Sequence, residues 1–209
     1  MIATMKQSCT FLNALVAASL TFTSLSAVAG PVVAQDLPQS QQGQAQVMPV
    51  QAVPTEELLR ELARPDQERW VRLERQILRR WARSGSAAID YLYGRGQAAL
   101  HTGQAEDAIA HFSAVIDHDP DFAEGWNGRA TAYFMINRLG QSLADIEQVL
   151  IRNPQHFGAL AGLGMILEQL DRPEEARAAY QASLAVHPHQ TSVLDAVARL
   201  DLATAGAAL

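Results

Sequence analysis

A pair of histidines, His187 and His189, flanks Pro188 and gives the closest spacing of metal-binding side chains in the chain. Two imidazoles could bind a metal ion, but a single H-x-H without further ligands predicts solvated surface histidines instead. The remaining histidines are scattered singly: His101, His111, His118 and His156. The sequence therefore predicts no metal site.

Two adjacent carboxylate pairs, Glu106–Asp107 and Glu174–Glu175, could in principle act as acid and base. Neighbours in a helix do not face each other, and negative charge is expected at a helix start, so we expect both pairs to stabilise helix ends. The sequence contains no Gly-rich phosphate loop, nucleophile elbow or H-E-x-x-H motif. We predict no enzyme, no cofactor and no small-molecule substrate.

The elements that carry these residues repeat. Pro120, Pro154 and Pro188 are spaced by 34 residues (154 − 120 and 188 − 154), which is the length of a helix-turn-helix unit. Proline cannot continue a helix, so each one closes a unit. Other positions keep their size at the same step: Leu92, Trp126 and Leu160 are bulky, Gly96, Ala130 and Gly164 small, Ala108, Ser142 and Ala176 small, and Phe112, Ile146 and Tyr180 bulky.

Within a unit, the spacing predicts two helices that pack closely. Bulky and small residues four apart share one face of the first helix, and the second helix presents a small residue followed four later by a bulky one. We therefore expect a seam in which small residues of one helix face bulky residues of the other.

This pattern resembles the tetratricopeptide repeat, whose signature is W-x2-L-G-x2-Y, then A-x3-F, then P. The matches are Gly96, Ala108, Phe112 and Pro120 in the first unit, Trp126, Tyr133 and Pro154 in the second, and Leu163, Gly164, Ala176 and Pro188 in the third. The resemblance spans residues 87–190, with units at about 89–122, 123–156 and 157–190. It implies an all-α, right-handed α-solenoid of helix-turn-helix repeats, here with capping helices at both ends.

In the family that the chain resembles, first helices line a concave groove that commonly holds a partner peptide. Helical geometry places a set of residues toward that groove: Asp90, Tyr93, Gln97, His101, Asn127, Thr131, Phe134, Met135, Met165 and Glu168, and also Leu100, Glu124, Ala161 and Gln169. Relatives that grip a terminal carboxylate use Lys, Arg and Asn there, and only Asn127 fits. We expect an apolar, neutral or basic segment instead, or, as an alternative, packing of these residues against each other or an N-terminal segment.

Arg95 and Arg129 stand where the signature has leucine. A buried arginine needs an acidic partner, because an unpaired buried charge is costly. A structural ion pair is expected rather than a ligand site, with Asp90, Asp119, Glu124 and Asp145 as candidate partners.

The N-terminus resembles a secretory signal peptide. Lys6 precedes an uncharged, largely apolar run from residue 11 to Ala29, with cleavage expected after Ala29 or Ala34. An uncleaved anchor is the alternative, and membrane contact is expected only in that case. Cys9, the only cysteine, would leave with the signal peptide, so the mature chain would have no disulfide.

Four further segments complete the chain. Residues 1–29 are the signal peptide, and the Gln-rich residues 30–53 form an expected flexible linker. Residues 54–86 read as a degenerate helical pair, with helices from Thr55 and over 67–83, whose apolar stripe covers the first end of the solenoid. Residues 191–209 contain a closing helix over about 192–203, with Val193, Val197 and Leu200 inward, and then a tail.

Charge limits the partners. With Lys6 removed, the chain has 15 Arg against 22 acidic residues, a formal charge of −7 (15 − 22), which argues against nucleic acid. We therefore expect a periplasmic or secreted scaffold or adaptor of bacterial type that binds a protein or peptide. An accessory subunit of an envelope enzyme and a membrane-tethered assembly factor are the alternatives.

Overall fold

The computed structural model of the chain describes residues 53–207, with side chains up to Thr204. The predicted signal peptide, its cleavage positions and the linker up to residue 52 lie outside this range. Residues 53–207 form helices and no strand, and none of these helices is long and apolar enough to span a bilayer. They are α1 (Thr55–Leu62), α2 (Trp70–Trp81), α3 (Ala87–His101), α4 (Ala105–His118), α5 (Ala123–Met135), α6 (Leu139–Arg152), α7 (Phe157–Gln169), α8 (Pro173–Val186) and α9 (Thr191–Ala207).

The turn inside each helix pair has a residue with a left-handed backbone. Gly103, Asn137 and Asp171, again 34 residues apart, have φ of 74°, 58° and 57°. Glycine has no Cβ to clash in this region, and Asn and Asp tolerate it better than other residues. The following amide then bonds back to the first helix, as when the Arg138 N–H donates to the Tyr133 carbonyl at 2.8 Å. The same turn therefore reverses the chain in α3–α4, α5–α6 and α7–α8.

Small residues bring neighbouring helices into close contact. A Cβ on Gly96 would lie 2.6 Å from the ring of Phe112, and one on Gly128 would lie 2.5 Å from the same ring. Phe112 of α4 is thus fully buried between α3 and α5. Gly164 faces the ring of Tyr180 in the same way. The predicted seam of small residues against bulky ones is confirmed.

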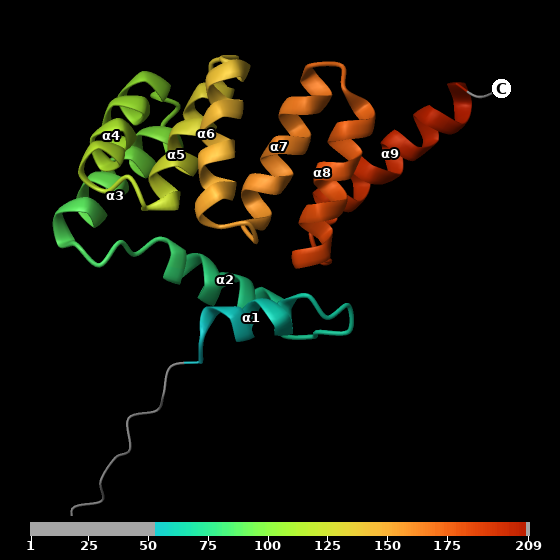
Figure 1. Cartoon of the computed structure of the whole chain (residues 1–209), viewed down its shortest axis with the longest axis horizontal. Coiled ribbons are helices and arrows are strands. Elements are labelled where there is room, and N and C mark those ends of the chain that lie inside the picture. Colours follow the sequence, from blue (N-terminus) through green and yellow to red (C-terminus); the bar gives the residue numbers. More distant parts are fainter. Residues whose placement is uncertain (1–52, 208–209) are drawn as a thin grey trace, which may run out of the picture. The chain divides into compact units, whose positions relative to one another are not determined.

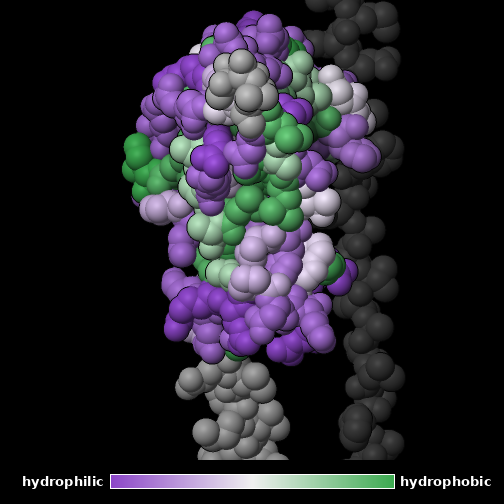
Figure 2. All heavy atoms as spheres, turned by 90° about the vertical axis from the view of Figure 1, so that its right-hand side faces the viewer, coloured by the Kyte–Doolittle hydropathy of each residue, from purple (hydrophilic) through white to green (hydrophobic). Residues whose placement is uncertain are grey.

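Helices α3 to α9 follow one another side by side in chain order (Figure 1). The closing helix α9 packs on α8 through Val193, Ala196 and Leu200, which are buried. The outer side of α9 carries the exposed Leu194 and Leu202, and Figure 2 shows apolar surface at this end of the stack between hydrophilic margins. The predicted all-α solenoid of helical repeats is confirmed.

The N-terminal helix pair α1–α2 lies in a different place from the one predicted. Its buried Leu58, Leu62 and Ile77 pack against Phe157 at the start of α7 and Val186 at the end of α8, instead of covering the first end of the stack at α3. The prediction of its position was wrong, because periodicity identifies an apolar face and not the surface that the face will meet. The pair covers the edge where the second and third repeats close.

Candidate functional site

An open pocket of about 230 Å³ lies between α5 and α7. Five of the residues predicted to face the groove line it: Asn127, Thr131, Phe134, Ala161 and Met165. The other lining residues are small or apolar except for Ser142: Ala130, Ser142, Ile146, Gly158, Gly162 and Ile166. Every lining residue is uncharged, so the pocket suits an apolar side chain.

The pocket exists because α7 presents small side chains to α5. At Gly162 an added Cβ would come no closer than 3.6 Å to Ile146, which is ordinary contact, so the helices leave space there. Ile146 and Ile166 are buried, and the Ser142 hydroxyl is already occupied as a donor to the Ala130 carbonyl at 2.8 Å. Met165 is 48 % exposed and supplies a flexible apolar side chain to the lining.

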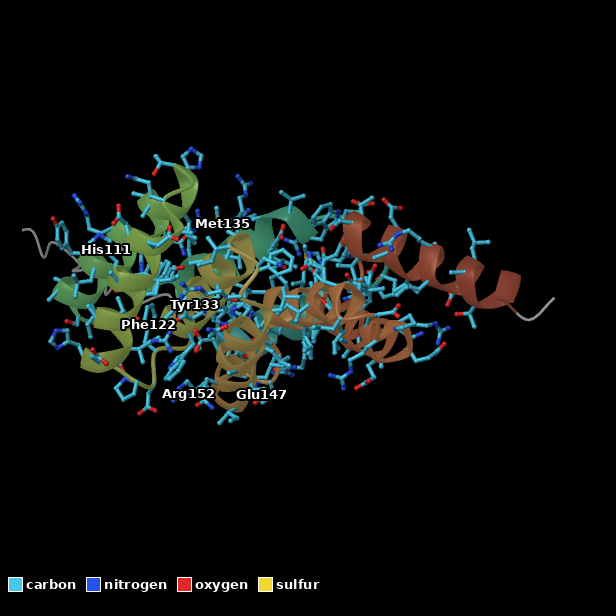
Figure 3. All side chains as sticks on the ribbon, turned by 90° about the horizontal axis from the view of Figure 1, so that it is seen from above. His111, Phe122, Tyr133, Met135, Glu147 and Arg152 are labelled. Atoms are coloured by element: carbon cyan, nitrogen blue, oxygen red, sulfur yellow. The ribbon has the colours of Figure 1, made fainter. Side chains whose placement is uncertain are left out.

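Other predicted groove residues do not line this pocket. Met135 is 47 % exposed and lies at the C-terminal end of α5 (Figure 3). His101 is exposed at the end of α3. Asp90 accepts hydrogen bonds from the amide and hydroxyl of Ser84, both at 2.8 Å, and these bonds lower the pKa of its carboxyl. The structure thus brings together only part of the predicted set.

Glu168, also predicted in the groove, is paired with the closing helix. Its carboxylate accepts from the two terminal nitrogens of Arg199 at 2.6 and 3.2 Å, and this hydrogen bonding lowers the pKa of Glu168. Burial raises the pKa of the nearby Tyr180 phenol, and Glu168 adds to that rise. Glu168 therefore links α7 to α9 through an ion pair with Arg199.

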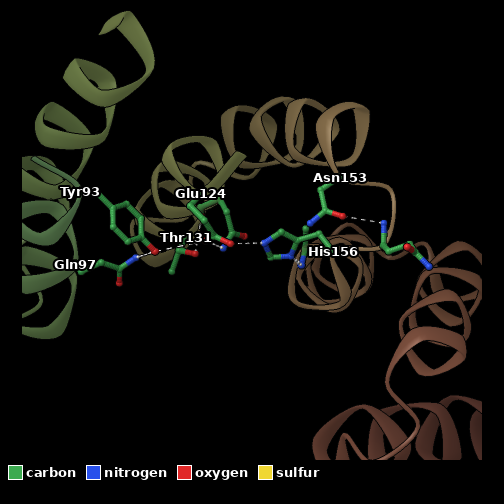
Figure 4. Close-up of polar contacts among 9 residues, drawn as sticks. Tyr93, Gln97, Glu124, Thr131, Asn153 and His156 are labelled. Atoms are coloured by element: carbon green, nitrogen blue, oxygen red, sulfur yellow. Dashed lines mark hydrogen bonds and ion pairs between the residues drawn. The ribbon is translucent and has the colours of Figure 1, made fainter. Parts of the chain in front are cut away.

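Tyr93 and Gln97 belong to a polar chain that crosses the stack (Figure 4). Gln97 donates to the Tyr93 hydroxyl at 2.8 Å, and that hydroxyl donates to Glu124 at 3.4 Å. Glu124 also accepts from Asn127 at 3.3 Å and from His156 at 3.0 Å. Burial raises the pKa of the Tyr93 phenol, and the charge of Glu124 raises it further, so Tyr93 remains a donor.

His156 ends this chain of bonds. It is buried, its Nδ1 accepts the Ala159 N–H at 3.0 Å, and its Nε2 therefore carries the proton donated to Glu124. His187, which was expected to be solvated, is buried as well, whereas His101 and His118 are exposed. The repeat contains a signal that could have located His156: Phe122, His156 and Gln190 occupy the same position at the start of successive first helices.

The structure separates the two arginines at the leucine position. Arg129 makes two bonds of 2.8 Å to the buried Asp145 and a third, of 3.1 Å, to the Ser113 hydroxyl. This confirms the predicted ion pair and selects Asp145 among the candidate partners. Arg95 is exposed and forms no ion pair with any described residue, so the expectation of burial was wrong there.

Both adjacent carboxylate pairs lie in the first turn of a helix, where negative charge stabilises the helix end. Glu106 and Asp107 are in the first turn of α4, and Glu174 and Glu175 in that of α8. Across residues 53–207 there is no group of three His, Cys, Asp or Glu side chains that could hold a metal ion.

The repeat, its glycine seams and its turns define a class of helical repeat protein, and sequence comparison identifies the family. The tetratricopeptide repeat profile matches residues 73–121, 93–145 and 127–190, so the chain belongs to the tetratricopeptide repeat family. A TPR repeat-containing protein of Rhizobium etli is 33 % identical over 131 residues, which are 63 % of this chain and 64 % of that protein. The chain thus spans somewhat less than two thirds of that relative's length.

Solved structures share the fold at low sequence identity. The first TPR of Spaghetti (RPAP3), bound to the HSP90 peptide SRMEEVD, is 22 % identical, has a TM-score of 0.54, and is matched over 56 % of this chain and 93 % of that one. The Yersinia enterocolitica secretion chaperone SycD, in complex with a peptide of the translocator YopD, is 14 % identical with a TM-score of 0.54, over 57 % and 96 %. Both structures contain a bound peptide.

Proposed function

We propose that this chain is a non-catalytic scaffold or adaptor of the bacterial cell envelope that binds a peptide segment between α5 and α7. The uncharged pocket lined by Phe134, Met165 and Ile146 is the observation that carries the proposal. Such a pocket buries an apolar anchor side chain, which is how a peptide in a helical groove gains most of its affinity. The peptide complexes of related folds support this mode of binding.

The proposed peptide is apolar and neutral or basic. The HSP90 peptide SRMEEVD held by the RPAP3 domain is acidic. In this chain the only pocket residue of the carboxylate-gripping type is Asn127, and its amide already donates to Glu124. An acidic peptide would meet no cation in the pocket and would lie near the buried Glu124 carboxylate, so charge disfavours it.

The test begins with selection of binders. Random 12-residue peptides displayed on phage are selected on the immobilised chain, and the selected peptides are synthesised for calorimetry. We expect peptides with apolar anchors and few acidic residues. Enrichment of peptides with acidic C-termini would contradict the proposed ligand class.

Two exposed methionines give a matched pair of variants. Met165→Glu introduces a charge at the pocket, and Met135→Glu introduces the same charge on an equally exposed methionine outside it. Met165→Glu should weaken peptide binding at least about tenfold, because a charge facing a desolvated apolar anchor is costly. Met135→Glu should stay within about twofold of the parent, and equal effects of the two variants would refute the assignment of the pocket.

A further inference from the structure

The helix pair α1–α2 is held on the solenoid by stacked aromatic rings. Trp81 stacks on His156 with ring centroids 4.6 Å apart, and Trp70 lies parallel to His189 at 5.4 Å. The two tryptophans are eleven residues apart, about three helical turns, so they share one face of α2. One helix thus contacts the closing loops of two successive repeats.

The histidines that receive α2 are specific to these two loops. The column of Phe122, His156 and Gln190 has histidine only in the second repeat, and the column of Asp119, Asn153 and His187 has it only in the third. The loop that closes the first repeat carries none. Histidines therefore occur in the two closing loops that α2 contacts, and they are not a general feature of the repeat.

His187 is the most constrained of these histidines. It is 1 % exposed, its Nδ1 has no hydrogen-bond partner among the described residues, and its Nε2 lies 3.6 Å from the Glu74 carboxylate of α2. The rings of Trp70 from α2 and Phe157 from α7 enclose it. A protonated His187 would bury a second N–H without an acceptor, which the docked state disfavours.

Burial of His187 sets the direction of the effect. Burial lowers the pKa of His187, Glu74 opposes this, and His189 adds to it; these are the titratable groups that act on it among the described residues. Detachment of α1–α2 removes Trp70 and Glu74 from around His187, so its pKa rises toward the ordinary value of about 6.5. Docking is therefore fully stable above about pH 6.5 and weakens as the pH falls below that value.

The connection to the solenoid permits movement of the pair. The chain passes from α2 to α3 through residues 82–86, where Gly85 has φ of 88° and open space around it. Ser84 is fixed to α3 by its bonds to Asp90. A movement of α1–α2 that leaves the start of α3 in place therefore occurs between the end of α2 and Ser84, at Ala82 and Arg83.

We propose that α1–α2 is an acid-released latch: protonation of His187 detaches the pair from the closing loops of repeats two and three. Release exposes Leu62 and Ile77, which are fully buried when docked, and uncovers Phe157. Acid thereby creates an apolar surface that is separate from the pocket between α5 and α7. The latch does not depend on peptide binding in that pocket.

The test is amide hydrogen exchange of the full chain at pH 7.5 and 5.0, corrected for the intrinsic pH dependence of exchange. Exchange in α1 and α2 should become about tenfold faster at pH 5.0 relative to the corrected rate, because the released state binds the extra proton. Exchange in α4 to α6 should not change. Equal acceleration in all helices would indicate acid unfolding and would overturn the latch.

Two variants and one control separate the effect of His187 from other causes of pH dependence. His187→Asn places at this position the residue that Asn153 supplies in the second repeat, with almost the same backbone angles, and should reduce the pH effect to within about twofold. Glu74→Gln removes the opposing charge and should enlarge the pH effect. His118→Asn, on an exposed histidine of α4, should leave it unchanged. A pH effect that persists in His187→Asn, or that Glu74→Gln does not alter, would refute the proposal.

Discussion

Single side chains decide how the same sequence position behaves in successive repeats. Arg95 and Arg129 are 34 residues apart, yet Arg95 is exposed and Arg129 lies over the ring of Trp126 at 5.1 Å with a bidentate bond to Asp145. The difference follows from the partner helix, because α6 provides a buried aspartate. The buried carboxylate in turn requires the arginine.

This pair predicts unequal effects of one substitution. Arg129→Met should lower the free energy of unfolding by about 2–3 kcal/mol, because it leaves the Asp145 carboxylate buried without its counter-ion. Arg95→Met should change it by no more than about 0.5 kcal/mol, since the side chain is exposed. Urea denaturation followed by circular dichroism measures both.

A double variant provides the control for that pair. Arg129→Met with Asp145→Leu removes both charges and should recover most of the loss, because the cost comes from the unpaired carboxylate. If Arg129→Met alone were as stable as the parent, the pair would have no structural role.

At the residue scale the sequence predicts the kind of contact that a side chain needs better than the residue that provides it. It showed that Arg129 needed an acid but left several candidates, because helix–helix distances decide which carboxylate is within reach. It predicted that His187 and His189 are solvated, whereas His187 is enclosed by rings of α2 and α7, and it did not single out His156, which caps α7. Their burial depends on the docking of α1–α2, which no local pattern encodes.

At the element scale, glycine spacing controls how closely helices approach. Gly94, Gly128 and Gly162 form one column of the repeat, but their surroundings differ. A Cβ on Gly94 would meet nothing within 4 Å, whereas one on Gly128 would lie 2.5 Å from Phe112. This position of the repeat thus has room for a larger side chain in α3, whereas in α5 the packing of Phe112 requires glycine.

Alanine substitution separates these roles. Gly128→Ala should destabilise the fold by about 2 kcal/mol through overpacking against Phe112. Gly94→Ala should stabilise it by about 0.5–1 kcal/mol, since alanine has a higher helix propensity than glycine and this position is exposed. Thermal unfolding with matched samples measures both, and a Gly128→Ala protein as stable as the parent would contradict the packing of Phe112 between α3 and α5.

The helices themselves were largely predictable. Proline spacing and apolar faces located the repeat helices, and the stripe of Trp70, Ile77 and Trp81 marked the apolar face of α2. The position of α1–α2 was not predictable, because an amphipathic helix pair buries its face on whichever surface complements it. The complement proved to be the histidine-bearing edge and not the end of the stack.

At the scale of the whole molecule, the stack creates a pocket that no single repeat contains. Its lining comes from α5, α6 and α7, so it requires two repeats in register. The sequence predicted five of its residues from helical facing alone: Asn127, Thr131, Phe134, Ala161 and Met165. It could not predict the space between α5 and α7, which depends on how the small residues Gly158 and Gly162 set the approach of the helices.

Export of the chain remains a proposal at this scale and has its own measurement. The intact mass of the protein recovered from the periplasm of an expressing bacterium should correspond to a chain beginning at Gly30 or Gln35, because signal peptidase cleaves after small residues. Recovery of the uncleaved chain in the membrane fraction would contradict export as a free protein and support the tethered alternative.

Methionine-methyl NMR tests the proposed peptide site most directly. The chain has five methionines, and two of them, Met135 and Met165, lie within the described helices, so their methyl signals can be assigned by Met→Leu substitution. Titration with a selected apolar peptide should shift the Met165 signal in step with binding and leave Met135 nearly unmoved. Saturation of binding without a change at Met165 would contradict a peptide site between α5 and α7.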